Sequence, residues 1–278
     1  MRAIGNRQRS KWSYVLAEAV LIIAILVVLL PLVWVLLTSL KTRVEAYQIP
    51  PKLVFKPTLE NYRALVEKYP FPLYMWNSLL VSLITTAISL IFGSFAAYSM
   101  SRFKTGGKFL KGWILNARTM LPMAIVLPFF MMFQKLNLHQ TRTALVITYL
   151  TFVFPLAVSL LLSFLESIPV ELEEAAMVDG CTRLQALVRV VMPLASPGLA
   201  ATSILCFIFS WNEFLFALVL TGRGTRTVPV AVSNFLTNQG VLIGELCAAS
   251  MVLIIPAMVL AFAVRNYLVS GLTMGAVK

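Results

Sequence analysis

Long apolar stretches alternate with shorter polar segments along the chain. Six of the stretches are long enough for membrane spans, because a helix needs about 20 apolar residues to cross a bilayer. Their approximate bounds are Tyr14–Leu37, Asn77–Met100, Gly112–Phe133, Thr141–Phe164, Pro197–Leu220 and Ile243–Tyr267. Within them, apolar residues do not alternate with polar ones as they do in a membrane barrel. The pattern predicts an all-α membrane protein with six transmembrane helices, whose backbone hydrogen bonds are satisfied internally.

The composition supports a membrane protein. Only 12% of the 278 residues are charged, against about 25% in soluble domains, and 59% are hydrophobic. The first stretch follows four basic residues and so resembles the start of a signal peptide. Its apolar run is too long for a signal peptide and no small-residue cleavage site follows it, so we expect an uncleaved first helix.

The formal net charge of +12 is explained by topology better than by nucleic-acid binding. Basic residues concentrate in segments that lie inside if the N-terminus is inside, as the positive-inside rule requires. The bias is moderate, because the outer segment 38–76 contains six further Lys and Arg residues. We therefore predict a cytoplasmic N-terminus (1–13), a six-span domain (14–267) and a cytoplasmic C-terminal tail (268–278). Within the domain, 38–76 is the long outer loop and 165–196 an inner loop.

The inner loop 165–196 has signals for two short helices. Glu171, Glu173 and Glu174 lie where the dipole of a first helix favours negative charge. Gly180 can end that helix in a left-handed conformation, and Thr182 with Gln185 matches a capping box that begins the second. Local chemistry alone leaves two interpretations open: an ordinary surface hairpin, or a rigid element that a partner protein binds.

The sequence shows no catalytic, nucleotide-binding or metal-binding motif. Gly106-Gly107-Lys108 is followed by Phe109 where a phosphate-binding loop needs Ser or Thr. His139 is the only histidine, and one histidine does not make a metal site. Cys181, Cys206 and Cys247 are too scattered for a disulfide framework or a thiolate site. We expect no enzyme activity and no cofactor in this chain.

Two polar features fall inside predicted spans. Ser78, Ser82, Thr85 and Ser89 share one helix face, which is typical of close helix packing and also of a polar pathway. Glu213 lies about 24 Å along the fifth span at 1.5 Å per residue, and a carboxylate at such depth is a candidate functional group. One hypothesis places Ser210, Asn212 and Glu213 along a translocation path. The alternatives are a structural pair of Glu213 with Arg118 or another subunit, or an interfacial carboxylate.

The inner loop also carries a resemblance to a known family. Glu174-Ala175-Ala176, then Gly180, Val190 and Met192-Pro193, is similar to the EAA signature of membrane subunits of bacterial ABC importers, with mild apolar exchanges at 190 and 192. Further segments resemble the MalG-type permease subunits of carbohydrate importers: Asn77-Ser78, Ala97–Phe103, Arg118–Pro122, Trp211–Phe214 and Gly271–Lys278. Met274 stands where Ala is more usual in that family.

The resemblance implies a type I ABC importer permease fold in the bacterial inner membrane. It implies that an EAA coupling helix docks on an ATPase through Glu174, Ala175, Ala176, Asp179, Gly180 and Pro193. It further implies these partners: a second, MalF-like permease, two copies of an ATP-binding subunit that hold ATP and Mg, and an external solute-binding protein. The tail residues Gly271, Thr273 and Gly275 would reach the ATPase, although their composition is also typical of a frayed end.

The expected function is therefore the permease subunit of an ATP-driven sugar importer. An ion-coupled secondary transporter is the alternative, but it would need intramembrane proton or ion relays, and Glu213 alone is poor support for one. A membrane-embedded enzyme would need clustered catalytic groups or metal ligands, and none is visible in the sequence.

Overall fold

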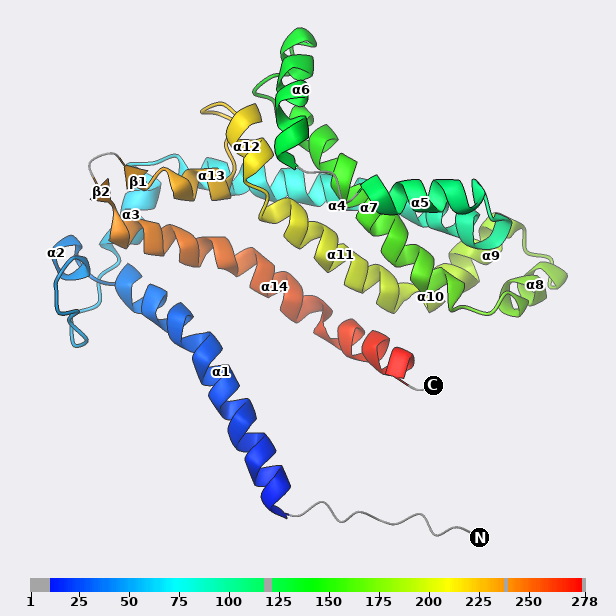
Figure 1. Ribbon diagram of the computed structural model, residues 1–278, viewed down its shortest axis with the longest axis horizontal. Helices are drawn as coiled ribbons and strands as arrows, with labels where there is room; N and C mark the ends of the chain where they lie inside the picture. The colour runs from blue at the N-terminus through cyan, green and yellow to red at the C-terminus, as the bar shows by residue number, and fades with distance from the viewer. Residues whose placement is uncertain (1–10, 118–121, 238–239, 277–278) are drawn as a thin grey trace. The chain divides into compact units, whose positions relative to one another are not determined.

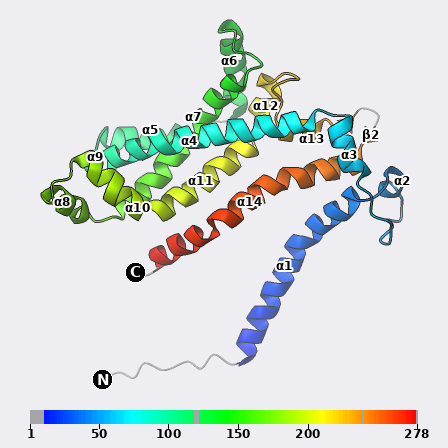
Figure 2. The ribbon, with the colours of Figure 1, turned by 180° about the vertical axis from the view of Figure 1, so that it is seen from behind.

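Three helices form the centre of the larger of the two units into which the structure divides. In the computed structural model, which describes residues 11–117, 122–237 and 240–276, α4 (Phe71–Phe103) and α7 (Arg142–Glu166) pack along each other, and α11 (Ser196–Trp211) packs against both (Figure 1). This unit comprises 69–234 and the residues from Val252 onward. In both views α8 (Glu171–Val178) and α9 (Arg183–Ala186) lie at the end of the unit farthest from α13 (Val228–Ser233) (Figure 2).

The remaining elements are short, apart from the first and last helices. They are α1 (Lys11–Ser39), α2 (Arg43–Ala46), α3 (Glu60–Glu67), α5 (Gly107–Ala117), α6 (Pro122–Lys135), the π-helical segment η1 (Leu187–Val191), α10 (Met192–Leu194), α12 (Leu215–Leu220), β1 (Leu236–Thr237), β2 (Gly240–Val241) and α14 (Ile243–Ala276).

The smaller unit contains residues up to Lys68 together with Phe235–Met251. Its polar centre is Asn61 on α3, whose amide nitrogen donates to the carbonyl oxygens of Ser39 and Lys41, both at 2.8 Å. These bonds hold the chain turn that follows α1. The strands β1 and β2 form an antiparallel pair in which Leu236 is opposite Val241.

The hydroxyl-bearing face of α4 is buried inside the larger unit. Ser82, Thr85 and Ser89 are each at most 1% exposed. Further along the same face, a Cβ on Gly93 would lie 3.4 Å from the Cβ of Ala157 on α7, so the two helices approach closely there. Small residues permit such an approach. Burial within one chain favours the packing interpretation of this face over a polar pathway.

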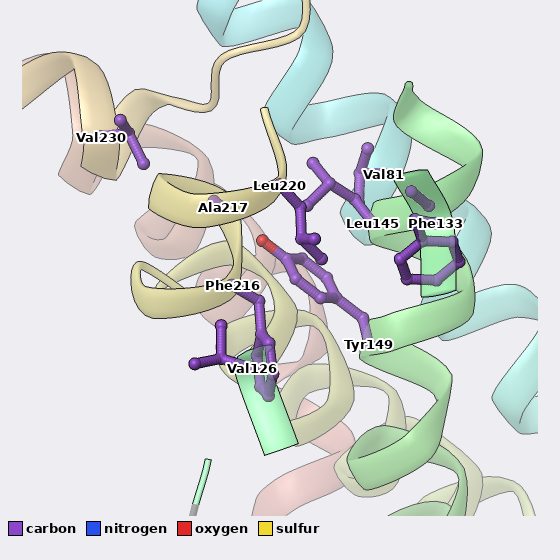
Figure 3. Packing of buried hydrophobic residues seen from close by; sticks show 10 residues of the cluster. Val81, Val126, Phe133, Leu145, Tyr149, Phe216, Ala217, Leu220 and Val230 are labelled. Carbon is purple, nitrogen blue, oxygen red and sulfur yellow. The ribbon is translucent and has the colours of Figure 1, made fainter. Parts of the chain in front are cut away.

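An apolar core joins α6, α7 and α12. Its largest side chains include Phe133, Tyr149, Phe216 and Leu220, all at most 2% exposed (Figure 3). The ring of Phe152 stacks on Phe216 with centroids 6.0 Å apart. Aromatic packing of this kind connects the short helix α12 to the long helix α7.

The predicted spans agree with the structure in part. By length and composition, four described helices can cross a membrane, and these lie in α1, α4, α7 and α14. The predicted third span falls on α5 and α6, which flank residues 118–121 outside the described part of the chain. The expectation of one continuous fifth helix over Pro197–Leu220 is wrong, because the chain leaves the helix after Trp211 and resumes it at Leu215. The six-span count and the domain boundaries stay predictions.

Candidate functional site

In the segment between α7 and α11, α8 and α9 are two short helices joined by a sharp turn, as the sequence predicts. At the end of α8, the Cys181 N–H bonds the Ala176 carbonyl at 3.0 Å and the Gly180 N–H bonds that of Met177 at 3.1 Å. This pair of bonds is a Schellman motif, which needs a left-handed residue after the helix. Gly180 supplies that conformation with φ +92°.

The second short helix begins immediately afterwards with the predicted capping box. The Gln185 N–H bonds the Thr182 hydroxyl at 3.3 Å, and the Gln185 side chain accepts from the Thr182 N–H at 2.8 Å. Two otherwise unpaired N–H groups are thereby satisfied. The turn between α8 and α9 is therefore specified by local chemistry at both ends.

The predicted docking residues lie on the outside of this segment. Glu174 and Ala175 on α8 are exposed, Ala176 is half-buried, and Asp179 and Gly180 at the turn are exposed. Pro193 is exposed as well, but it belongs to α10, beyond the π-helical segment η1. The structure therefore gathers the other predicted residues on α8 and its turn, and places Pro193 on a different helix.

Apolar side chains are exposed next to these residues. Val178 is 87% exposed, Leu184 61% and Leu172 45%. Leu187 and Val191, which follow α9, are by contrast buried against α7. The α8–α9 segment thus buries one side against the helices and presents acidic and apolar side chains on the other. Such a mixture is typical of a protein-binding surface.

Sequence reasoning missed the residues that fix α8 to the larger unit. Glu173 is the buried residue of α8, and its Oε2 accepts a hydrogen bond from Arg102 Nε of α4 at 3.0 Å. Tyr98, one turn earlier on α4, donates to the other carboxylate oxygen. Glu173 was noted only for its place at the helix N-terminus. The sequence indicates only that Arg102, four residues after Tyr98, lies on the same helix face; nothing in it links this face to Glu173.

The candidate pathway residues surround the break between α11 and α12. Ser210 is buried, with no hydrogen-bond partner for its hydroxyl among the described residues. Asn212 is exposed, and its amide bonds the Ile208 carbonyl of its own helix at 3.0 Å. The three predicted side chains therefore have different surroundings, although they are near neighbours in sequence.

Glu213 caps the second half of the broken helix. Its carboxylate accepts from the backbone N–H groups of Phe216 at 2.8 Å and Ala217 at 3.0 Å. The hydroxyl of Tyr149 on α7 points toward α12 (Figure 3). It interacts electrostatically with the Glu213 carboxylate. A negative group at a helix N-terminus is stabilised by the dipole and by the unpaired N–H groups. The expected alternative partner, Arg118, lies outside the described residues.

The tail residues Gly271, Thr273 and Gly275 lie on α14, which continues to Ala276, rather than in an irregular end. Among the described residues, no group of three or more His, Cys, Asp or Glu side chains could hold a metal ion.

Comparison with known proteins decides the family. Residues 89–273 match the family described as binding-protein-dependent transport system inner membrane component. The chain belongs to this family.

Relatives of known assignment agree with that membership. The trehalose transport system permease protein SugB of Mycobacterium tuberculosis is 38% identical over 256 residues, covering 90% of this chain and 92% of SugB. The trehalose/maltose transport system permease protein MalG of Thermococcus litoralis is 35% identical over 262 residues, covering 92% of this chain and 94% of MalG. A crystal structure of a bacterial ABC transporter involved in the import of the acidic polysaccharide alginate contains a similar chain. It is 25% identical with a TM-score of 0.74, covering 94% of this chain and 98% of that one.

This member of the inner-membrane component family is a permease subunit of a binding-protein-dependent importer. The resemblance to MalG-type permeases of carbohydrate importers is confirmed. Membership in this family does not favour the alternative of an ion-coupled secondary transporter. The relatives of this chain are permease subunits, and its fold is that of importer permeases.

Proposed function

We propose that the chain is the sugar-translocating permease subunit of an ATP-driven importer, and that α8 is the helix through which ATPase subunits act on it. The observation that carries the docking role is the exposed α8–α9 segment. It has acidic Glu174 and apolar Val178 outside, and Glu173 fixed inside. Glu174, Ala175, Ala176, Asp179 and Gly180 would contact the ATPase directly, with Pro193 at the re-entry into the membrane.

The proposed assembly contains this chain, a second, MalF-like permease, two ATP-binding subunits and an external solute-binding protein. ATP and Mg would bind to the ATPase subunits, so this subunit contributes no catalysis. In the proposed topology the chain spans the inner membrane six times. Both termini and the α8–α9 segment then lie on the cytoplasmic side, where ATP is available to the docked subunits. Gly271, Thr273 and Gly275 on α14 would add a second contact with the ATPase.

The substrate class rests on the relatives. Trehalose and maltose occur in the names of two of them, and alginate in the description of the third. For this chain we infer a sugar, delivered from outside by the binding protein. Asn212 supports a pathway at the break of the fifth span, since its amide is exposed and can donate and accept hydrogen bonds with sugar hydroxyls. The proposed pathway also includes Ser210 and Glu213, which lie on either side of Asn212. In the structure Ser210 is buried by packing, and Glu213 caps α12.

The docking role is tested by changing the exposed surface of α8. Glu174→Lys and Gly180→Pro should each lose the ATPase subunits or uncouple ATP hydrolysis from import, while the membrane helices remain folded. Glu67→Lys on α3 is the matched control, because it is the same reversal at another exposed glutamate. Co-purification of ATPase subunits and import into proteoliposomes are the measurements. Normal values for both α8 variants would contradict the docking role.

The substrate class is tested separately with a panel of trehalose, maltose and alginate oligosaccharides. Each labelled sugar is offered to proteoliposomes that contain the complete transporter and its binding protein. Import of one panel sugar that requires ATP supports the proposal. Import without any ATPase subunit would support a secondary transporter instead.

A further inference from the structure

The contact between α8 and the last turns of α4 is unusually polar for a buried one. The side chains of Arg102 and Glu173 are only 7% and 4% exposed, and their Nε and Oε2 atoms are 3.0 Å apart. Tyr98 donates to the second oxygen of Glu173. Arg102 also donates through a terminal guanidinium nitrogen to the Ile168 carbonyl at 3.1 Å, just before α8. We call Tyr98, Arg102 and Glu173 the Arg102–Glu173 network.

A second contact attaches α9 to the same end of α4. The guanidinium carbon of Arg183 on α9 lies 5.1 Å from the ring centroid of Phe103, the last residue of α4. Phe103 in turn meets Tyr98 edge to face, with ring centroids 6.1 Å apart. The two arms of the α8–α9 segment therefore attach to one end of α4, on either side of the turn at Gly180.

The chemistry of this attachment fixes the orientation of α8 relative to α4 and contributes little to stability. A buried ion pair is weak evidence for stability, because removing both charges from water costs about as much as their attraction returns. Apolar packing would hold α8 equally well. The network adds a fixed orientation, because both carboxylate oxygens of Glu173 and two guanidinium nitrogens of Arg102 form hydrogen bonds at defined geometry. A helix held in this way cannot rotate or slide against α4 without breaking several bonds together.

The network also has a direct connection to the bundle. α4 packs along α7 and α11, and it approaches α7 closely at Gly93. Immediately after the network, α4 ends with Lys104 in a left-handed conformation, φ 52°. The attachment is thus at the terminus of a 33-residue helix, where a displacement of α8 acts on the whole of α4.

We propose that Arg102 and Glu173, oriented by Tyr98, are the positioning residues that transmit the movement of α8 into α4 and hence into the helices of the permease. The proposal rests on the proposed docking of α8 and deepens it. It assigns the role to residues whose side chains are largely buried within this chain, and not to the exposed residues of α8. Breaking the network should leave docking intact and make the transport step inefficient.

The experiment compares variants in the complete transporter, reconstituted with its binding protein. Arg102→Ala and Glu173→Gln should retain their ATPase subunits. Import of the panel sugar per ATP hydrolysed should fall more than tenfold, and ATP hydrolysis without sugar should rise at least threefold. The charge exchange Arg102→Glu with Glu173→Arg should recover much of the coupling that either single reversal loses. A merely structural contact would lower assembly, hydrolysis and import in parallel.

A matched control is the ion pair between Lys111 of α5 and Glu166 of α7. Its atoms are 2.9 Å apart, but each side chain is 48% exposed. Lys111→Ala should therefore change the import per ATP by less than twofold, because exposed pairs are weak.

Two results would overturn the proposal. One is an unchanged import per ATP, and unchanged hydrolysis without sugar, in assembled Arg102→Ala and Glu173→Gln transporters. The other is loss of the assembled complex in every single variant with no recovery in the charge exchange. Failure of the docking role is distinguishable, because Glu174→Lys would then also be without effect. If no panel sugar is imported by the unchanged transporter, hydrolysis without sugar still decides between the outcomes.

Discussion

Gly180 shows at the residue scale how one position specifies the α8–α9 turn. Its φ of +92° lies where side-chain-bearing residues are strained, although an added Cβ would meet nothing within 4 Å. The requirement is therefore conformational and not steric. Strain of this type costs on the order of 1–3 kcal/mol.

Gly180→Ala should consequently strain the turn and shift the α8–α9 segment without removing any contact. We expect a loss of about 1–3 kcal/mol of local stability, seen as faster amide exchange in α8 and weaker retention of ATPase subunits. Gly112→Ala in α5 is the control: it also has open space around it, and a helical site gains about 1 kcal/mol from alanine. Equal exchange rates in the two variants would contradict the argument.

At the element scale, Glu213 decides where the fifth span resumes. Glu213→Leu removes both acceptors and leaves the N–H groups of Phe216 and Ala217 without partners, so we expect a loss of about 1–3 kcal/mol. Glu213→Gln keeps one acceptor oxygen and should lose less. Thermal unfolding of the purified complex measures both effects. A Leu variant as stable as the unchanged protein would refute capping, whereas a stable Gln variant with poor import would favour the pathway role of the charge.

Asn77 connects two elements that are far apart in sequence. Its amide nitrogen donates to the carbonyls of Gly224 at 3.1 Å and Arg226 at 3.0 Å, so it holds the loop before α13 to the start of α4. Asn77→Leu should lower stability by about 1–3 kcal/mol, because two hydrogen bonds worth about 0.5–1.5 kcal/mol each are lost. Asn212→Leu should change stability by less than about 0.5 kcal/mol, since that amide is exposed. Comparable unfolding temperatures for the two variants would count against this role of Asn77.

Helices and turns could be predicted from the sequence where a single local pattern determines them. Apolar run length located α1, α4, α7 and α14, and the cap residues located the α8–α9 turn. The break after Trp211 was missed although Asn212 and Glu213 interrupt the apolar run there. Apolar residues resume at Phe214, and the break depends on the carboxylate of Glu213 bonding the next turn. The periodicity of apolar residues does not show whether a helix continues or breaks at such a position.

The missing part of the candidate site has a different cause. Arg102 and Glu173 are 71 positions apart in the chain, and either residue alone is typical of a solvated helix end. Only the packing of α4 against the segment after α7 brings them together. A contact of this separation depends on the fold, so no local reading of either segment predicts the pair.

On the scale of the whole molecule, the orientation of the chain in the membrane decides whether the proposed function is possible. An ATPase on the cytoplasmic side can reach α8 only if the α8–α9 segment is on that side too. The cysteines provide native probes. Cys181 lies half-buried just after Gly180, Cys206 is buried in α11 and Cys247 is half-buried in α14.

A membrane-impermeant maleimide should label Cys181 in inverted vesicles and not in intact spheroplasts, in a Cys247→Ser background. Cys206 should resist the reagent from both sides until the protein is unfolded, because it is 0% exposed. Lys135→Cys at the exposed end of α6, combined with Cys181→Ser, should show the opposite sidedness. Removing the ATPase subunits from inverted vesicles should speed up the labelling of Cys181, since docking on α8 covers its turn. Labelling of Cys181 from the outer side would reverse the topology, and no cytoplasmic ATPase could then act through α8.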